Sequence, residues 1–126
     1  MHIVSKTKEF QSPVLGGGEH IVELLSPHEN LGNAQNHSII RLELAPGASS
    51  PPLQHFHKNS EETYVIECGS ADIVIEGKKY SLSVGDIVLV GAREMHQITA
   101  TGDMELRALA IMSPGFDPGD IYEAGA

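Results

Sequence analysis

One stretch of the sequence decides the fold: Pro46 to Gly69, which reads PGASSPPLQHFHKNSEETYVIECG. It contains two histidines, His55 and His57, one residue apart. Because alternate residues of a strand share a face, both imidazoles should point the same way, with Cα atoms roughly 6.5 Å apart. Two imidazoles at that spacing can bind one metal ion at metal–nitrogen distances of about 2.0–2.1 Å.

A carboxylate follows these histidines. A turn at residues 58–60 can lead into a second strand, and both Glu61 and Glu62 stand at its start. Since neighbours on a strand point to opposite faces, only one of the two should face inward. The apolar residues that follow do not settle the parity, because a strand covered on both sides is apolar throughout. The residues alone therefore leave Glu61 and Glu62 open as the third ligand.

A third histidine lies farther along, at the end of residues 85–96, which read GDIVLVGAREMH. A turn there starts a buried apolar strand, a second turn follows, and His96 opens the next strand. Antiparallel pairing could bring His96 beside His55 and His57. Three imidazoles and one carboxylate suit a first-row divalent ion with one or two positions left for water or substrate.

These two stretches resemble the two conserved motifs of the cupin superfamily. The residues that match its first motif, although with a longer spacer after the first glycine, are Gly47, His55, His57, Glu62 and Gly69. The spacing of that motif selects Glu62 over Glu61. The second motif is matched by Gly85 and His96, while Gly91 and Arg93 replace its usual proline and glycine. These two replacements affect which cupin subfamily the chain resembles. They do not affect the predicted metal binding, because the spacing of the histidine is unchanged.

The resemblance implies an all-β fold, the cupin double-stranded β-helix or jelly-roll barrel, as one domain over residues 1–126. Motif one would span 47–69 and motif two 85–100. It also implies one divalent transition metal (Fe, Mn, Zn or Ni) on His55, His57, Glu62 and His96.

Most small cupins pair into homodimers, often with an N-terminal strand that joins the partner's sheet. The resemblance implies the same here for residues 1–25. Either Ile3–Phe10 or His20–Leu25 would be that strand, and it would cover an exposed sheet edge.

The residues outside the motifs also indicate an all-β sandwich or barrel, because short apolar or alternating runs are separated by turn residues. Gly and Pro interrupt the chain throughout, and no long segment has helical periodicity. A hairpin turn is expected at Glu76-Gly77-Lys78-Lys79. The expected strands are His20–Leu25, Ser38–Ala45, Thr63–Cys68, Ala71–Glu76, Ile87–Val90, Gln97–Thr101 and Met104–Met112.

Two segments are expected to be irregular. The polar connection at 26–36 is either a lid over the barrel mouth or a plain surface excursion. The tail from Ser113 onward, with two prolines and three glycines, is expected to wrap the outside of the barrel or fray.

Two pairs of residues are further candidates for the site. Tyr64 shares the expected inward face with Glu62, so either could move a proton, although Tyr64 could equally be a core aromatic residue. Arg41 and Glu43 share one face of the strand Ser38–Ala45 and could bind a polar substrate if that face lines the cavity. If the face meets solvent, which we favour, they form an ordinary ion pair. The same alternation turns three residues away from the metal: Gln54, Phe56 and Gln97.

Composition excludes several classes of partner. The chain has 8 Lys+Arg against 17 Asp+Glu, a net charge of -9, which argues against nucleic acid and anionic membranes as partners. No run approaches the roughly 18 apolar residues that span a bilayer, and no signal peptide is visible. The single cysteine, Cys68, excludes an intrachain disulfide framework and fits a reducing compartment. We therefore expect a cytoplasmic protein that binds a small molecule.

Three functions remain open, because small cupins share their ligand set across different reactions. The first, which we expect, is an oxygen-dependent dioxygenase-type oxidoreductase with Fe or Mn. The second is a redox-neutral isomerase, lyase or cyclase in which the metal polarises a carbonyl and Glu62, Tyr64 or a metal-bound hydroxide moves a proton. The third is a binding module that holds a metal and a small molecule without turnover.

Overall fold

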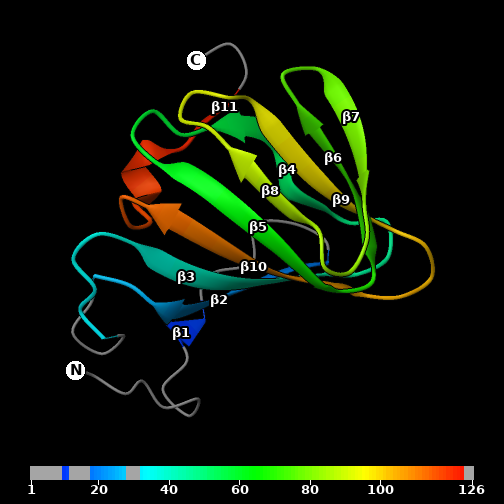
Figure 1. Cartoon of the computed structure of the whole chain (residues 1–126), viewed down its shortest axis with the longest axis horizontal. Helices are drawn as coiled ribbons and strands as arrows, with labels where there is room; N and C mark the ends of the chain where they lie inside the picture. The colour runs from blue at the N-terminus through cyan, green and yellow to red at the C-terminus, as the bar shows by residue number, and fades with distance from the viewer. Residues whose placement is uncertain (1–9, 12–17, 28–31, 124–126) are drawn as a thin grey trace.

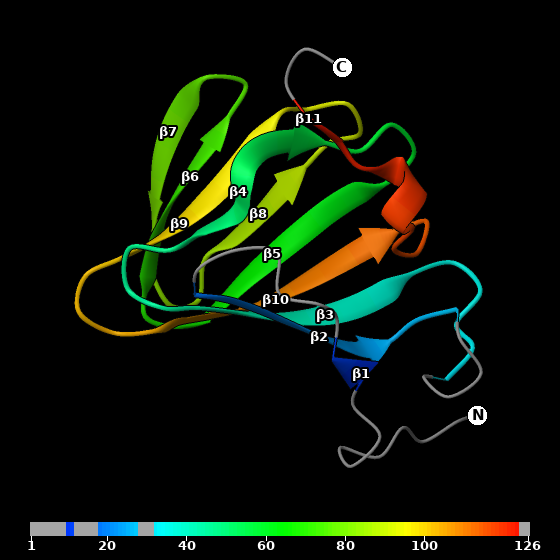
Figure 2. The same ribbon diagram turned by 180° about the vertical axis from the view of Figure 1, so that it is seen from behind.

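The computed structural model describes residues 10–11, 18–27 and 32–123, and they form two antiparallel sheets that face each other (Figures 1 and 2). The six-stranded sheet has the order β1-β2-β3-β10-β5-β8. Its strands are β1 (Phe10–Gln11), β2 (Glu19–Leu25), β3 (Ser38–Leu44), β10 (Leu106–Ser113), β5 (Glu61–Cys68) and β8 (Ile87–Val90).

The five-stranded sheet has the order β11-β4-β9-β6-β7. Its strands are β11 (Tyr122–Glu123), β4 (Ser49–Phe56), β9 (His96–Thr101), β6 (Ser70–Ile75) and β7 (Lys78–Leu82). A short 3-10 turn, η3 (Pro118–Asp120), precedes β11. The two sheets confirm the all-β barrel that the sequence predicts.

The core lies between the sheets and follows from strict alternation along the strands. On β5, Tyr64 and Ile66 point inward, and on β9, Ile98 does the same from the opposite sheet. Burying an aliphatic side chain of this size stabilises the fold by about 1.5–3 kcal/mol. The core includes these large, almost fully buried side chains: Leu44, Ile66, Ile73, Ile98 and Leu106.

Gly69, the last residue of the first motif, is required where the chain crosses from β5 to β6. Its φ is +82°, and a Cβ at this position would lie 2.6 Å from the backbone oxygen of Glu105. Only glycine combines a left-handed backbone with so close an approach. The motif glycine therefore lets the β9–β10 connection pack directly against this crossing.

The predicted strands correspond to β2, β3, β5, β6, β8, β9 and β10. The predicted hairpin joins β6 to β7 through Glu76 and Gly77, both at positive φ, as a two-residue turn requires. The strand predicted from Met104 begins only at Leu106.

The predicted lid and exchange strand are described only in part. Residues 28–31 of the 26–36 segment lie outside the described residues, and the Ala34 amide donates to the Ser26 carbonyl at 2.9 Å. Of the strand predicted over Ile3–Phe10, only Phe10 is described, and it pairs with β2. The segment His20–Leu25 lies in β2 and pairs with β3 of the same chain.

Candidate metal centre

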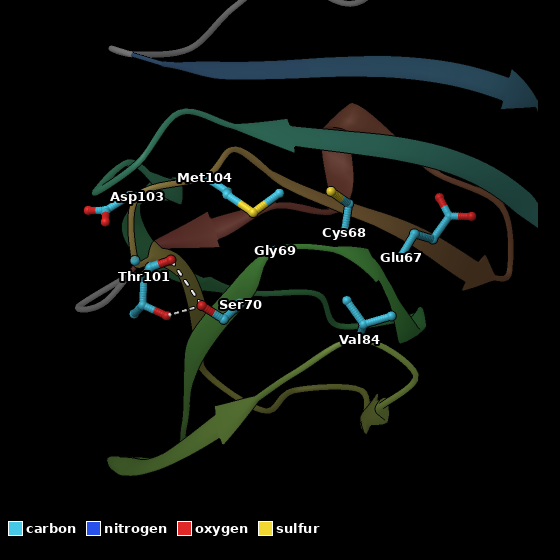
Figure 3. Close-up of a pocket in the computed structure, with 9 residues that line it drawn as sticks. Glu67, Cys68, Gly69, Ser70, Val84, Thr101, Asp103 and Met104 are labelled. Carbon is cyan, nitrogen blue, oxygen red and sulfur yellow. Dashed lines mark hydrogen bonds between the residues drawn. The ribbon is translucent and has the colours of Figure 1, made fainter.

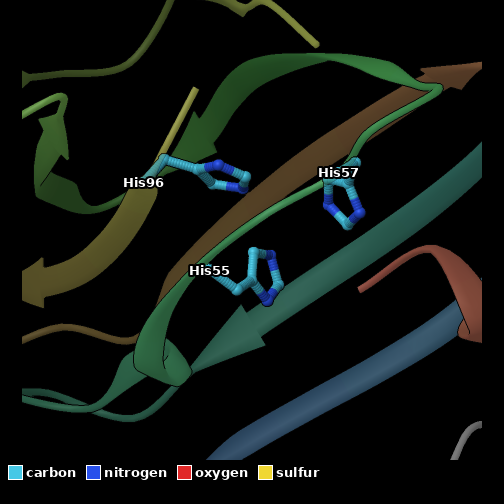
Figure 4. Close-up of side chains that lie close together, drawn as sticks. All are labelled: His55, His57 and His96. Atoms are coloured by element: carbon cyan, nitrogen blue, oxygen red, sulfur yellow. The ribbon is translucent and has the colours of Figure 1, made fainter. Parts of the chain in front are cut away.

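Three histidines from two neighbouring strands meet at one end of the barrel. His55 lies on β4, His57 follows directly after that strand, and His96 is the first residue of β9. His55 and His96 are opposite each other in the β4–β9 register. Figure 4 shows the three rings turned toward one another, and their ligand nitrogens lie within 4.8 Å of one another. The structure thus brings together the three histidines predicted from their spacing.

Glu62 approaches the same point from the opposite sheet. It is the second residue of β5 and only 7% exposed, whereas Glu61 is exposed. Its Oε1 lies 3.2 Å from His96 Nε2 and 3.8 Å from His57 Nε2. Of the two glutamates that the sequence leaves open, the buried one beside the histidines is the one that the motif spacing selects.

Two of the histidines are held by backbone carbonyl groups. His57 Nδ1 donates to the Asp120 carbonyl at 2.9 Å, and His96 Nδ1 donates to the Glu94 carbonyl at 3.0 Å. A carbonyl oxygen can only accept, so in the neutral ring the proton is on Nδ1 and the Nε2 lone pair is free. Both Nε2 atoms face Glu62, as a metal-binding imidazole requires.

The donor set fits a divalent transition metal. His96 is 0% exposed, and its Nε2 makes no hydrogen bond of acceptable geometry despite its proximity to Glu62. An unsatisfied buried nitrogen costs about 1–3 kcal/mol. A cation shared by the imidazole nitrogens and the carboxylate would satisfy it. Such a nitrogen- and oxygen-rich set suits first-row divalent ions.

The electrostatics of the cluster favour neutral His55 and ionised Glu62. Burial, with the nearby rings of His96 and His57, lowers the pKa of His55 to about 3. Burial opposes ionisation of Glu62, but His96, His57 and the Tyr64 hydroxyl outweigh it and hold the pKa of Glu62 below its ordinary value. Burial also opposes protonation of His96, yet Glu62 raises the pKa of His96 above its ordinary value.

Tyr64 lies on β5, one inward position beyond Glu62. Its hydroxyl donates to Glu62 Oε1 at 2.9 Å, and its ring centroid is 6.4 Å from that of His96. Burial, with the charge of Glu62, raises the pKa of the Tyr64 phenol well above its ordinary value. The phenol therefore keeps its proton beside the cluster, although the side chain also belongs to the core.

The structure does not bring Arg41 and Glu43 to the histidines. On β3 they alternate with Ile40, Leu42 and Leu44, which face the core, so the pair lies on the outer face of the sheet. Arg41 Nε and Glu43 Oε1 are 3.1 Å apart, each partly exposed. Arg41 and Glu43 therefore form an ion pair on a solvent-facing surface, which is the alternative that we favoured from the sequence.

Sequence reasoning missed two buried acidic residues, one beside the histidines and one next to the apolar core. Asp120, in η3, is 4% exposed, and its backbone carbonyl accepts a hydrogen bond from His57 Nδ1. Glu19, on β2, is 3% exposed; Ser50 donates to its Oε1, and its Oε2 has no hydrogen-bond partner. The hydrogen-bond partners of both side chains lie 31 or more residues away in the sequence, so no local pattern marks either residue.

A pocket of about 430 Å³ lies away from the histidines (Figure 3). It is formed where β5 passes to β6 and β9 passes to β10, including Cys68 and Met104. Ser70 Oγ donates to the Thr101 carbonyl at 3.0 Å across its floor. Because Cys68 is the last residue of β5 and Glu62 is its second, the pocket and the histidine cluster lie at opposite ends of that strand.

Comparisons with known proteins agree with this geometry. The family model Cupin_2, described as a cupin domain, matches residues 40–112. An uncharacterized protein of Aquifex aeolicus is 26% identical over 107 residues, covering 79% of this chain and 86% of that protein.

Two solved structures are similar in fold. A predicted oxalate decarboxylase of Thermotoga maritima is 26% identical, with a TM-score of 0.72 over 90% of this chain and 99% of that one. Pac13 of Streptomyces, a nucleoside dehydratase, is 12% identical, with a TM-score of 0.74 over 98% of this chain and 91% of that one. The second likeness shows the fold alone. Within the described residues, no helix has the length and apolar character to cross a membrane.

Proposed function

The chain belongs to the Cupin_2 family of cupin domains, and from that premise we propose that it is a metal-dependent enzyme acting on a small oxygen-bearing molecule. One observation carries the proposal: the buried convergence of three imidazoles and a carboxylate, including a His96 nitrogen without a hydrogen-bond partner. The residues that would hold the ion are His55, His57, Glu62 and His96.

The bound metal would supply Lewis-acid chemistry, polarising a carbonyl or hydroxyl oxygen. Three imidazoles and one carboxylate are compatible with Fe, Mn, Zn or Ni. The walls beyond the cluster are mostly apolar, so a small substrate with a few oxygens suits the interior better than a large polar one.

Although the sequence led us to expect a dioxygenase, we now favour redox-neutral chemistry, an isomerase, lyase or cyclase type of reaction, because the chain places a protonated hydroxyl beside the cluster. Tyr64 holds a proton at its hydroxyl, 2.9 Å from Glu62 Oε1, and its raised pKa keeps that proton in place at neutral pH. The raised pKa makes the phenol a weak acid, so the support for this role is the position of the hydroxyl beside the cluster and not its acidity. The dehydratase activity of Pac13 supports the same class by likeness of fold only.

A dioxygenase is the second candidate, favoured by the ligand set itself. Three imidazoles and one carboxylate suit Fe and Mn, the metals that support oxidation. A binding module without turnover would use the same ligands, and it is distinguished only by the absence of a reaction.

Metal content tests the proposal most directly. We expect protein purified without chelators or nickel resin to retain about one transition-metal ion per chain by elemental analysis. A His55→Ala/His57→Ala double variant should retain almost none, while Glu61→Gln, a change at the exposed neighbouring glutamate, should retain as much as the wild type. Equal metal content in the double variant and the wild type would refute the site.

Oxygen uptake separates the two enzyme classes. Zn or Ni as the native metal, without oxygen consumption in the presence of candidate hydroxy-carbonyl compounds, supports the redox-neutral enzyme. Fe or Mn with substrate-dependent oxygen consumption supports the dioxygenase instead.

We also propose that the protein forms a homodimer through the outer face of the six-stranded sheet. Ile87 and Leu89 on β8 are 67% and 58% exposed, and Val65, their neighbour on β5, lies on the same face. An exposed apolar face on an edge strand marks an interaction site. Leu89→Glu should give a monomer by light scattering, whereas Leu53→Glu, an equally exposed position on β4, should not.

We place the protein in the cytoplasm. Its single cysteine, Cys68, is free and forms no disulfide within the chain, which fits a reducing compartment. Fractionation of cells that express the chain tests this placement, and recovery in a secreted fraction would contradict it.

A further inference from the structure

The C-terminal segment lies outside the part of the chain that the family model matches, yet it returns to the histidines. After β10, the chain forms η3 and then β11, which pairs with the end of β4. Figures 1 and 2 both show β11 alongside β4. In this pairing Tyr122 is opposite Phe56, and Glu123 is opposite His55. The segment therefore adds a strand to the one that carries His55 and leads to His57.

Asp120 is the point where this segment contacts the His57 turn. Its carboxylate accepts one hydrogen bond from the Lys58 amide at 2.9 Å and another from the Asn59 amide at 3.0 Å, one on each oxygen. Its own carbonyl accepts from His57 Nδ1 at 2.9 Å. A single buried residue thus makes three hydrogen bonds to three consecutive residues.

These contacts leave one tautomer and one orientation for His57. With the proton on Nδ1 directed at the Asp120 carbonyl, the unprotonated Nε2 faces Glu62 Oε1, 3.8 Å away. His96 obtains the same constraint from Glu94, two residues before it in its own turn. His57 instead depends on a residue 63 positions away in the sequence.

The carboxylate is needed to keep the Asp120 carbonyl in place. The Lys58 and Asn59 amides belong to the turn between β4 and β5, and each requires an acceptor when partly buried. Charge-assisted bonds from a carboxylate to two amides are stronger than neutral ones. An amide side chain supplies only one acceptor oxygen, and its NH2 group would face the second N–H.

We propose that Asp120 is a positioning residue of the metal site, which fixes the tautomer and direction of His57 and couples the C-terminal segment to metal binding. Its role toward the metal rests on the proposed function. Partners that hold a metal-binding histidine typically change metal affinity by about 10–100-fold when they are removed.

The test compares Asp120→Asn and Asp120→Ala with a matched control, Asp117→Asn. Asp117 lies three residues earlier, is exposed, and caps η3 by accepting from the Gly119 amide. Asparagine caps a turn as well as aspartate does, so the control makes the same chemical change without touching the His57 turn. Chelator-competition titrations with Zn²⁺ should show affinity about 10-fold weaker in Asp120→Asn, weaker still in Asp120→Ala, and unchanged in the control.

A second readout needs no metal. Long-range ¹H–¹⁵N spectra of the apoprotein should show His57 as the Nδ1–H tautomer in the wild type and the control. The Nε2–H form should gain population in Asp120→Ala, because the carbonyl is no longer anchored. His96 should keep its tautomer in every variant, since its carbonyl partner belongs to its own turn.

The two readouts separate failure of this inference from failure of the proposed function. If the wild-type protein binds none of Zn²⁺, Ni²⁺, Mn²⁺ and Fe²⁺ while Asp120→Ala still shows the His57 tautomer change, the metal site is refuted and the positioning role stands. Unchanged tautomer and affinity in both Asp120 variants overturn the inference. If Asp120→Ala fails to fold, Asp120→Asn alone decides the question, because it retains one acceptor and the side-chain volume.

Discussion

The two ends of the barrel interior are built from the same strands but have opposite chemistry. On β9, His96 faces the polar end and Ile98, two residues later, is packed in the apolar end; both are 0% exposed. On β5, Glu62 and Tyr64 face the histidines, while Ile66 joins the apolar core. One end contains buried groups that need a partner, and the other contains buried groups that need only close packing.

This difference assigns stability and function to separate parts of one strand. Side chains two residues apart share a face, so the change in chemistry occurs within about 6–7 Å. The apolar end supplies the free energy that tolerates an unsatisfied nitrogen and a buried carboxylate at the other end. Mutations at the two ends should therefore differ in what they affect, even when burial is equal.

The largest effect on stability is expected at the apolar end. Ile98→Ala should lower the free energy of unfolding by about 2–5 kcal/mol, because it leaves a cavity between the two sheets. Urea denaturation of the apoprotein measures this loss. Metal affinity of the folded variant should remain near that of the wild type, and a large loss of affinity would show that the two ends are not independent.

The second effect, at the polar end of the same strand, should have the reverse pattern. His96→Ala should weaken Zn²⁺ binding by more than about 100-fold, beyond the loss expected from removing a partner of a ligand. It should destabilise the apoprotein less than Ile98→Ala does, because removal of the imidazole also removes a buried nitrogen without a hydrogen-bond partner. An apoprotein as unstable as Ile98→Ala would instead make His96 a packing residue.

The sequence predicts the polar end better than its surroundings because the histidines follow local spacing. His55 and His57 share a face by strand alternation. Glu62 and His96 were selected by the resemblance to the two cupin motifs, so none of the four needed knowledge of the sheet order. The face of Arg41 and Glu43 depended on which side of β3 met β4 and β9, which only the packing of the two sheets shows.

Long-range contacts explain what the sequence did not predict. Asp120 acts on His57 across 63 positions, from a tail that composition alone described as irregular. Glu19 faces the interior because β2 pairs with β3 so that Glu19 lies opposite Leu44, a register with no signal in the residues of β2 themselves. From the sequence alone, both acidic residues resemble ordinary surface charges. Only the pairing of the strands shows that they are buried.

The smallest predicted effect concerns Glu19, which lies next to the apolar part of the core rather than in the metal cluster. It is 3% exposed on β2, and the carboxyl bridges the two sheets through Ser50 on β4. Burial outweighs the Ser50 hydrogen bond and raises the pKa of Glu19 above its ordinary value of 4.5. The native state therefore binds this proton more tightly than the unfolded chain does.

The sign of the pH dependence follows from that difference. The stabilisation is fully present below pH 4.5 and is lost as pH rises from there through the native pKa of Glu19. Glu19→Gln has no proton to lose, so its stability relative to the wild type should increase over this interval, by roughly 1 kcal/mol, the lower range for an unpaired buried acceptor. Urea denaturation of both proteins at several pH values from 4 to 8 measures the difference. A difference that stays constant with pH would mean that the native and unfolded states bind this proton equally tightly, so that burial does not raise the pKa of Glu19.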